Sequence, residues 1–249
     1  MIKLFPIPTP AKLTPEIAQA LTLEFIKTKK AVWKGHNIPK TLLKMSHQKC
    51  CYCECHIEEE SKYMEVEHFC HKDEYNFLVL EWSNLLPSCK RCNTTKGNHD
   101  VYLSPIVKPT KDKPKEHLCY YEFRLYPKTT LGGNTIEVLD LNNSTRLVIP
   151  RFKLGEILKE QLINLIELTR EFDSGKSTST KRKNRIVGTL ERLMREAIPS
   201  AVYSAIMATI LLKDDCYQQT KAIFKKHQLW TTEFQELEQQ AKFCALDLK

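Results

Sequence analysis

The 249-residue sequence contains no apolar run that approaches the roughly 18 residues of a membrane span. Residues 1–13 carry three prolines and lack the apolar stretch of a secretory signal peptide. These absences predict a cytoplasmic protein, a compartment in which thiols stay reduced. Paired cysteines in such a protein are expected to bind metal rather than to form disulfides.

A complete nucleotide-binding loop is also lacking. Residues 174–178, Ser-Gly-Lys-Ser-Thr, resemble the end of a Walker A loop. That loop needs a glycine five residues before Gly175, where this chain has Arg170, and no strand is expected before it. Residues 173–180 are therefore predicted to be a polar loop, and any ATPase is expected in another chain.

The composition allows a folded, basic protein. Hydrophobic residues make up 42% of the chain and aromatic residues 9%, which is enough for a core. Thirty-eight Lys and Arg residues against 30 Asp and Glu residues give a net charge of +8. This charge suits a polyanionic partner without showing one. The basic residues 181–185 either contact a nucleic-acid backbone or form a solvated helix start or partner contact.

Most of the ten cysteines lie between positions 50 and 92. Two CxxC pairs, Cys50 with Cys53 and Cys89 with Cys92, are separated by 35 residues. Two such pairs complete the tetrahedral sulfur coordination that favours structural Zn²⁺. A pair of Cys51 and Cys55 is an alternative, although Tyr52 inside the first pair favours Cys50 and Cys53. The isolated Cys70 is expected to pack as a small apolar side chain.

Local patterns predict the secondary structure. Thr14 and Pro15 begin a helix that runs towards Lys30, and Pro39 begins a short helix over residues 40–46. Further along the chain, strands are predicted over 62–68 and 82–88, followed by a helix over 91–98 that ends at Gly97. Two more strands are predicted over 120–125 and 135–141, with a turn at 132–134. From Pro150 onward the pattern predicts helices, with a break at Pro199.

Three segments resemble a known family. They are VEHF, NLLPSC and CNTTKG, framed by the CxxC pairs, and they are similar to the HNH endonucleases with a ββα-metal core. The resemblance implies that His68 is the general base and that Glu67 and Asn93 hold a catalytic Mg²⁺ or Mn²⁺. It also implies that Asn84 orients the histidine. A neutral imidazole and a hard cation with oxygen ligands suit phosphodiester hydrolysis near pH 7.

Four neighbouring residues are candidates for contacting nucleic acid: Lys96, Arg91, His71 and His99. The two histidines lie close to the motif in sequence and could contribute to the site, but a surface or phosphate-facing position is favoured, because a lone histidine is weak evidence of ligation. The expected fold is α+β, with a ββα-metal HNH core stapled by the four-cysteine zinc site, a short β extension and a helical C-terminal part. The expected segments are 1–47 (extended and helical), 48–105 (nuclease core), 106–149 (basic connection and strands) and 150–249 (helical scaffold).

A closer resemblance covers more of the chain. The proline-rich start, the WSNLLPSCKRCN segment and TIEVLDLN are similar to the PtuB family of HNH subunits in Septu anti-phage systems, a family that also occurs in some retrons. This resemblance implies a PtuA-like ABC/SMC-type ATPase as partner, a nucleic-acid substrate and, in the retron case, an RNA–DNA molecule with its reverse transcriptase. The helical C-terminal part would bind the partner, and no membrane is involved.

Two alternatives to DNA hydrolysis stay open. The same site can attack RNA such as tRNA, because a base and a metal do not need the 2′-OH. A module stapled by zinc can also bind nucleic acid or protein without cutting. In that case Glu67, His68 and Asn93 could all be replaced by alanine without loss of function.

Overall fold

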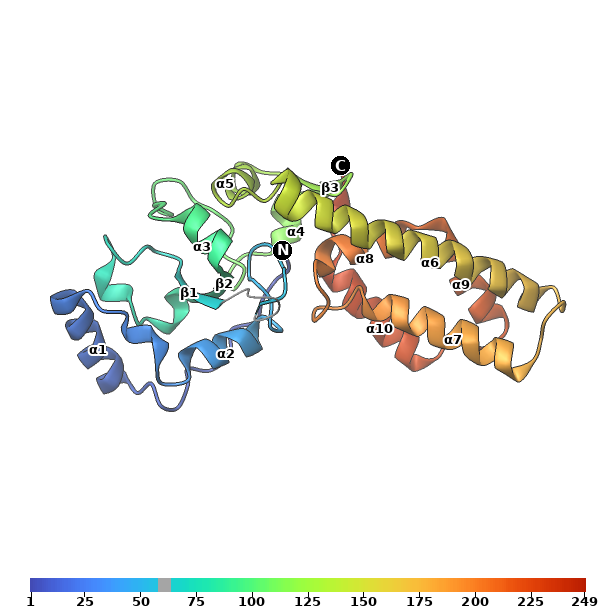
Figure 1. Ribbon diagram of the computed structural model, residues 1–249, viewed down its shortest axis with the longest axis horizontal. Helices are drawn as coiled ribbons and strands as arrows, with labels where there is room; N and C mark the ends of the chain where they lie inside the picture. Colours follow the sequence, from blue (N-terminus) through green and yellow to red (C-terminus); the bar gives the residue numbers. More distant parts are fainter. Residues whose placement is uncertain (58–63) are drawn as a thin grey trace. The chain divides into compact units, whose positions relative to one another are not determined.

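The computed structural model describes residues 1–57 and 64–249, and its helices and small sheets confirm the predicted α+β class (Figure 1). These residues form two compact units. The first consists of Met1, Lys3–Leu118 and Tyr126–Leu141, and the second of Ile2, Cys119–Leu125 and Asn142–Lys249. No helix in the described ranges is long and apolar enough to cross a membrane. The finer division into four segments stays a prediction.

The first unit begins with two predicted helices. Helix α1 (Pro15–Thr28) starts at Thr14, whose hydroxyl accepts a hydrogen bond of 3.3 Å from the backbone N–H of Ile17. A side-chain cap followed by proline is a standard helix start. A short 3-10 turn (Val32–Lys34) leads to α2 (Ile38–Met45), which begins two residues earlier than predicted and buries four of its side chains.

Two strands and a helix follow. Strand β1 (Met64–His68) pairs antiparallel with β2 (Leu85–Cys89), with Met64 opposite Cys89 and His68 opposite Leu85. Helix α3 (Lys90–Lys96) starts directly after β2 and contacts both strands. Its end at Gly97, which has a φ of 51°, agrees with the predicted stop.

Two details of this prediction change. Residues 62 and 63 of the first predicted strand lie outside the described residues. The second predicted strand, 82–88, begins too early, because Trp82–Asn84 form a 3-10 turn and β2 starts at Leu85. The carboxylate of Glu81 accepts a hydrogen bond from the backbone N–H of Ser83, which favours this turn. A similar turn, Asn76–Leu78, lies in the connection between β1 and β2.

The predictions for residues 120–125 hold in part, and those for residues 132–141 are wrong. The expected strand 120–125 is divided between the end of β3 (Leu118–Tyr121) and the start of β4 (Arg124–Pro127), and these two strands follow the short helix α4 (Pro114–His117). Residues 122 and 123 both adopt positive φ there. The expected turn at 132–134 and strand at 135–141 are replaced by helix α5 (Thr130–Val138). A Cβ on Gly132 would lie 2.0 Å from the carbonyl oxygen of His117, so this glycine permits close packing rather than a turn.

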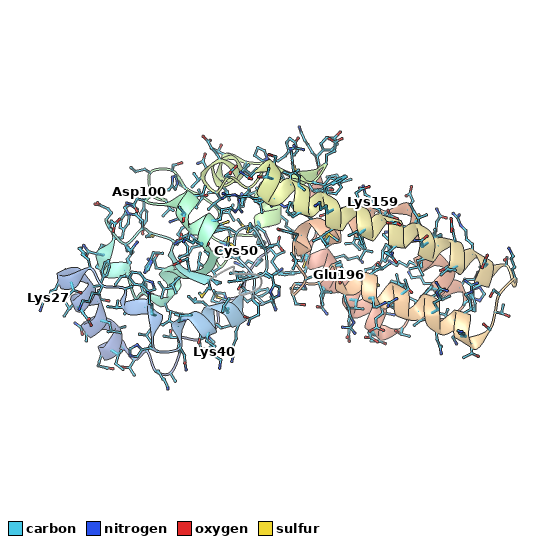
Figure 2. All side chains as sticks on the ribbon, viewed as in Figure 1. Lys27, Lys40, Cys50, Asp100, Lys159 and Glu196 are labelled. Carbon is cyan, nitrogen blue, oxygen red and sulfur yellow. The ribbon has the colours of Figure 1, made fainter. Side chains whose placement is uncertain are left out.

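The second unit is mainly helical, as predicted. A π-helical turn (Ser144–Val148) leads into its elements, which are α6 (Ile149–Asp173), α7 (Thr180–Arg195), α8 (Ser204–Lys213), α9 (Asp215–Lys226), α10 (Thr232–Cys244) and β5 (Asp247–Leu248). Strand β5, which was not predicted, pairs parallel with β3. The predicted loop at 173–180 joins α6 to α7, where Ser179 caps α7. Buried aliphatic side chains recur along α6, while Lys159 on the same helix is partly exposed (Figure 2).

Candidate active site and metal centre

Four buried cysteines gather in the first unit. The sulfur atoms of Cys50, Cys53, Cys89 and Cys92 all lie within 4.8 Å of one another. Cys53 Sγ and Cys89 Sγ are 3.8 Å apart. This is about the 3.8 Å separation that tetrahedral geometry gives for two Zn–S bonds of about 2.3 Å. The chemistry and spacing of the donors therefore fit the predicted zinc ion.

Backbone turns place both cysteine pairs. The first pair lies in a turn in which the N–H of Cys50 donates to the carbonyl of Cys55 (2.9 Å) and the N–H of Glu54 donates to that of Cys50 (3.0 Å). In the second pair, Cys89 ends β2 and caps α3, and its sulfur accepts from the N–H of Cys92 at 3.5 Å. The four-sulfur group, which could hold a metal, therefore includes the junction of β2 and α3.

The remaining thiols of this region lie outside the four-sulfur group. Cys51 and Cys55 are both buried, but neither belongs to the group that the described residues form. The backbone N–H of Cys51 donates to the carbonyl of Pro87 at 2.9 Å and ties the first cysteine pair to β2. Cys70 is buried after β1. The structure thus brings the second cysteine pair to Cys50 and Cys53 rather than to Cys51 and Cys55.

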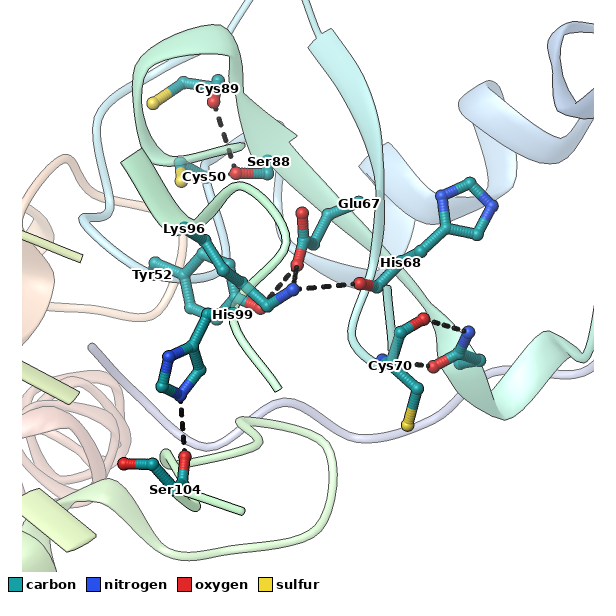
Figure 3. A network of polar contacts seen from close by, with 11 residues as sticks. Cys50, Tyr52, Glu67, His68, Cys70, Ser88, Cys89, Lys96, His99 and Ser104 are labelled. Carbon is teal, nitrogen blue, oxygen red and sulfur yellow. Dashed lines mark hydrogen bonds and ion pairs between the residues drawn. The ribbon is translucent and has the colours of Figure 1, made fainter. Parts of the chain in front are cut away.

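Glu67 takes part in a buried ion pair. Its Oε1 atom lies 2.8 Å from Nζ of Lys96 and accepts a hydrogen bond of 3.2 Å from the hydroxyl of Tyr52. Nζ of Lys96 also donates to the backbone carbonyl of His68 at 3.0 Å (Figure 3). Burial raises the pKa of Glu67, and the ammonium of Lys96 opposes that rise. Lys96, a candidate for contacting nucleic acid, is thus held inside the protein.

His68 lies on the opposite side of β1. Figure 3 shows its imidazole turned away from the carboxylate of Glu67, as expected for consecutive residues of a strand. Its Nε2 atom lies 3.1 Å from the carbonyl oxygen of Val79, and its ring lies edge-on to that of Trp33 with centroids 4.6 Å apart. Burial, assisted by the charge of Lys72, lowers the pKa of His68 to about 4. The imidazole is therefore neutral near pH 7.

A small cavity of about 120 Å³ connects the predicted catalytic residues. Glu67, His68 and Asn93 all line it. Glu67 and His68 come from β1 and Asn93 from α3, so the cavity lies where strand and helix meet. Its volume holds a few water molecules, at about 30 Å³ each. The cavity can therefore hold water beside residues that carry an imidazole, an amide and a carboxylate, although the carboxylate of Glu67 itself is directed towards Lys96.

Asn84 fixes the backbone near His68 rather than its ring. Its Oδ1 accepts from the N–H of Cys70 at 2.7 Å, and its Nδ2 donates to the carbonyls of Cys70 (3.1 Å) and Leu78 (3.2 Å). The carbonyl of Asn84 accepts from the N–H of Phe69 at 2.9 Å. The carbonyl that contacts the His68 ring comes from Val79, one residue after Leu78.

The other three candidates for contacting nucleic acid lie in three different parts of the first unit. His71 lines the same cavity as His68. Nη2 of Arg91 lies 3.4 Å from the sulfur of Cys92, next to the metal centre. His99 lies half-buried, with Nε2 2.6 Å from the carbonyl oxygen of Ser104. Of these three residues, only His71 lies at the cavity.

Sequence reasoning missed two residues of the cavity wall and one supporting contact. Trp33 and Lys72 both line the cavity, and Lys72 Nζ lies 6.0 Å from the centroid of the Trp33 ring. Trp33 precedes the motif by many residues, and no local pattern connects them. Local sequence marks Tyr52 only as a residue inside the first cysteine pair, because its hydrogen bond to Glu67 depends on tertiary packing.

Comparison with known proteins gives a consistent result. No family model matches the chain. The chain is 43% identical over 229 residues to the Septu protein PtuB of Bacillus thuringiensis, an alignment that covers 92% of this chain and 89% of that protein. It is also 30% identical over 170 residues to the Septu protein PtuB of Bacillus mycoides (strain KBAB4), and this second alignment covers 54% of this chain and 56% of that protein.

Proposed function

The chain belongs to the PtuB family of Septu anti-phage defence effectors, and we propose that it is a metal-dependent HNH endonuclease that hydrolyses phosphodiester bonds in DNA. The observation that carries this proposal is the setting of His68. It is a neutral, oriented imidazole that lines the same cavity as Asn93 and Glu67. The order of strand, strand and helix in β1, β2 and α3, with the four-sulfur group that includes Cys89 at the end of β2 and Cys92 in α3, supports an HNH core.

In this proposal His68 accepts the proton of the attacking water. Because a carbonyl oxygen can only accept, Nε2 of His68 must carry the hydrogen that contacts Val79. Nδ1 is then the basic nitrogen of the neutral ring. The edge of Trp33 restricts rotation of the imidazole. A depressed pKa keeps the base unprotonated, which general base catalysis requires.

Glu67 and Asn93 are the residues that would hold Mg²⁺ or Mn²⁺, because carboxylate and amide oxygens are the donors that these cations prefer. When bound, such an ion stabilises the charge that develops on the phosphate and on the leaving oxygen. Lys96 already contacts Oε1 of Glu67, so its ammonium would share the Glu67 carboxylate with a bound cation.

We further propose a PtuA-like ABC/SMC-type ATPase as the partner. The Walker-like residues 174–178 lie in the connection between α6 and α7 and do not follow a strand, which is consistent with an ATPase in a separate chain. The helical second unit offers the surface for that partner. The matched relatives are both Septu proteins, so we do not include a retron RNA–DNA molecule or a reverse transcriptase in the proposal.

The test is cleavage by the purified chain, alone and with its ATPase, in Mg²⁺ or Mn²⁺. Labelled DNA and RNA, including tRNA, are supplied in parallel. We expect DNA cleavage that His68→Ala abolishes and that His117→Ala retains, because His117 belongs to α4 and does not line the cavity. If the protein cleaves RNA and not DNA, the proposed substrate is wrong and RNA takes its place.

A binding module without catalysis gives a different pattern. It predicts that Glu67→Ala, His68→Ala and Asn93→Ala all preserve protection against phage, while removal of zinc abolishes protection. If the three variants protect cells as well as the parent does, the nuclease proposal is wrong.

A further inference from the structure

A row of aromatic side chains extends from the cavity that His68 lines. His71 lines this cavity, and its ring centroid lies 5.5 Å from that of Tyr75. Tyr75 lies 5.2 Å from Tyr102 and 6.5 Å from Phe77, again between centroids. We call these four residues the aromatic row. Because each ring contacts the next, the row forms a continuous path away from the cavity.

The outer rings of the row are exposed, and Asp100 holds the central tyrosine and the backbone of Tyr102. Phe77 is 65% exposed and Tyr102 is 64% exposed, which is high for large rings in a folded domain. The hydroxyl of Tyr75 donates to Oδ2 of Asp100 at 2.9 Å, and Oδ1 of Asp100 accepts from the backbone N–H of Tyr102 at 2.8 Å. Because the central ring and the backbone of Tyr102 are fixed in advance, less conformational entropy is lost when a ligand binds the row.

A second cavity lies at the far end of the row. It has a volume of about 440 Å³ and is lined by Tyr102 together with Lys108 and Lys111. Lys72 lines the first cavity. The row therefore joins two hollows, each with lysine in its wall. Nδ1 of His71, a residue that lines the first cavity, is buried and has no hydrogen-bond partner among the described residues.

Aromatic faces interleaved with lysines are the pattern that binds single-stranded nucleic acid. Bases in a duplex have their faces covered by their neighbours, so only unpaired bases can stack on Phe77 or Tyr102. The exposed Asp73 and Glu74 follow Lys72 directly, so stacking rather than net charge must supply the affinity. The row also begins at the cavity in which the proposed cleavage takes place, which favours a substrate over a protein partner.

We propose that the aromatic row binds unpaired bases of the substrate, so that the enzyme acts on single-stranded or locally unpaired nucleic acid. This inference rests on the proposed nuclease function and assigns its substrate class. DNA and RNA present the same base faces, and the experiment separates them.

The experiment measures binding without cleavage. The full-length His68→Ala protein, without divalent cations, is titrated into labelled single-stranded DNA, duplex DNA of the same sequence and single-stranded RNA, and fluorescence anisotropy is recorded. We expect Tyr102→Ala and Phe77→Ala each to weaken single-strand binding by about five-fold or more, since one stacked base contributes about 1–3 kcal/mol. Tyr102→Phe keeps the ring and should bind like the parent. Phe152→Ala removes an exposed ring of the second unit and should also bind like the parent.

Three results would overturn the inference. The alanine variants could bind single strands as tightly as the parent, duplex DNA could be bound as tightly as single strands, or the variants could lose only their association with the ATPase. Cleavage by the protein with His68 intact is measured separately. Absence of cleavage contradicts the nuclease proposal. Equal cleavage of single-stranded and duplex nucleic acid contradicts only the assignment of the aromatic row.

Discussion

Lys96 Nζ lies 2.8 Å from Oε1 of Glu67, and both side chains are buried. The pair links α3 to β1, and the hydroxyl of Tyr52 links it to the first cysteine pair. Removing one partner of a buried ion pair leaves an uncompensated charge, which costs about 3–5 kcal/mol. We expect Lys96→Met to lower the free energy of unfolding by this amount, as measured by urea denaturation.

The double variant Lys96→Met/Glu67→Gln provides the control. It leaves no buried charge, so it should recover part of the lost stability. If Lys96→Met alone is as stable as the parent, the two side chains do not form this pair in solution.

Removal of zinc should unfold the first unit and spare most of the second. We expect Cys92→Ser to lose bound zinc, because it removes one of four ligands and the site supplies folding free energy. Cys55→Ser is the matched control and should retain one zinc per chain, since Cys55 lies outside the four-sulfur group. Elemental analysis gives the stoichiometry, and retention of zinc by Cys92→Ser would exclude this ligand set.

Asn84 should affect catalysis by positioning the backbone near His68 rather than by contacting the substrate. Asn84→Ala removes three side-chain hydrogen bonds to Cys70 and Leu78. We expect a loss of about 2–3 kcal/mol of stability, because buried backbone groups lose their partners. We also expect cleavage to fall while the zinc content is unchanged. Wild-type cleavage rates in this variant would show that Asn84 does not position His68.

Two adjacent glycines of α5 should respond in opposite ways. In Gly132→Ala the new Cβ would lie 2.0 Å from the carbonyl oxygen of His117, so we expect a loss of about 2–3 kcal/mol from overpacking. In Gly133→Ala the nearest atom lies 3.8 Å away, so we expect a gain of about 0.5–1 kcal/mol from helix propensity. Thermal melting of both variants decides this, and equal effects would argue against the helix.

Glu238 should make the second unit sensitive to acid. Burial acts to raise its pKa, but hydrogen bonds from Lys221, Lys242 and Tyr217 outweigh burial and lower it. The stability from a depressed carboxyl pKa is present above its ordinary value near 4.5 and is lost as the pH falls through the folded value.

The variant Glu238→Gln tests whether Glu238 contributes stability at neutral pH that is lost in acid. We expect it to be less stable than the parent at pH 7, and the difference to shrink towards pH 3. Urea denaturation across this range measures the effect. A difference that stays constant with pH would show that the titration of Glu238 contributes nothing.

The sequence predicted those elements whose signals are local. The cap at Thr14, the stop at Gly97 and the cysteine spacing each depend on a few neighbouring residues, and the structure has an element or cluster at each place. Helix α5 could not be predicted in this way. Gly132 favours a turn by its local sequence, and the close approach of the His117 carbonyl, which explains the glycine in a helix, depends on tertiary packing.

The candidate site was predictable only in part. The strand motif places Glu67 next to His68, but the partner of each depends on packing. Lys96, predicted to contact nucleic acid, pairs with Glu67 in the structure, and the carbonyl that contacts the His68 ring belongs to Val79. No periodicity in the sequence connects Trp33 to this cavity.

The way in which the chain crosses between its units limits how the protein can be shortened. Residues Cys119–Leu125 belong with the helical unit, whereas Tyr126–Leu141 return to the first. A fragment of residues 142–249 alone would lack β3, the strand that pairs with β5, and Phe123, whose ring lies against Gly155 of α6. A truncated helical fragment should therefore aggregate or melt early unless the segment 119–125 is grafted back onto it.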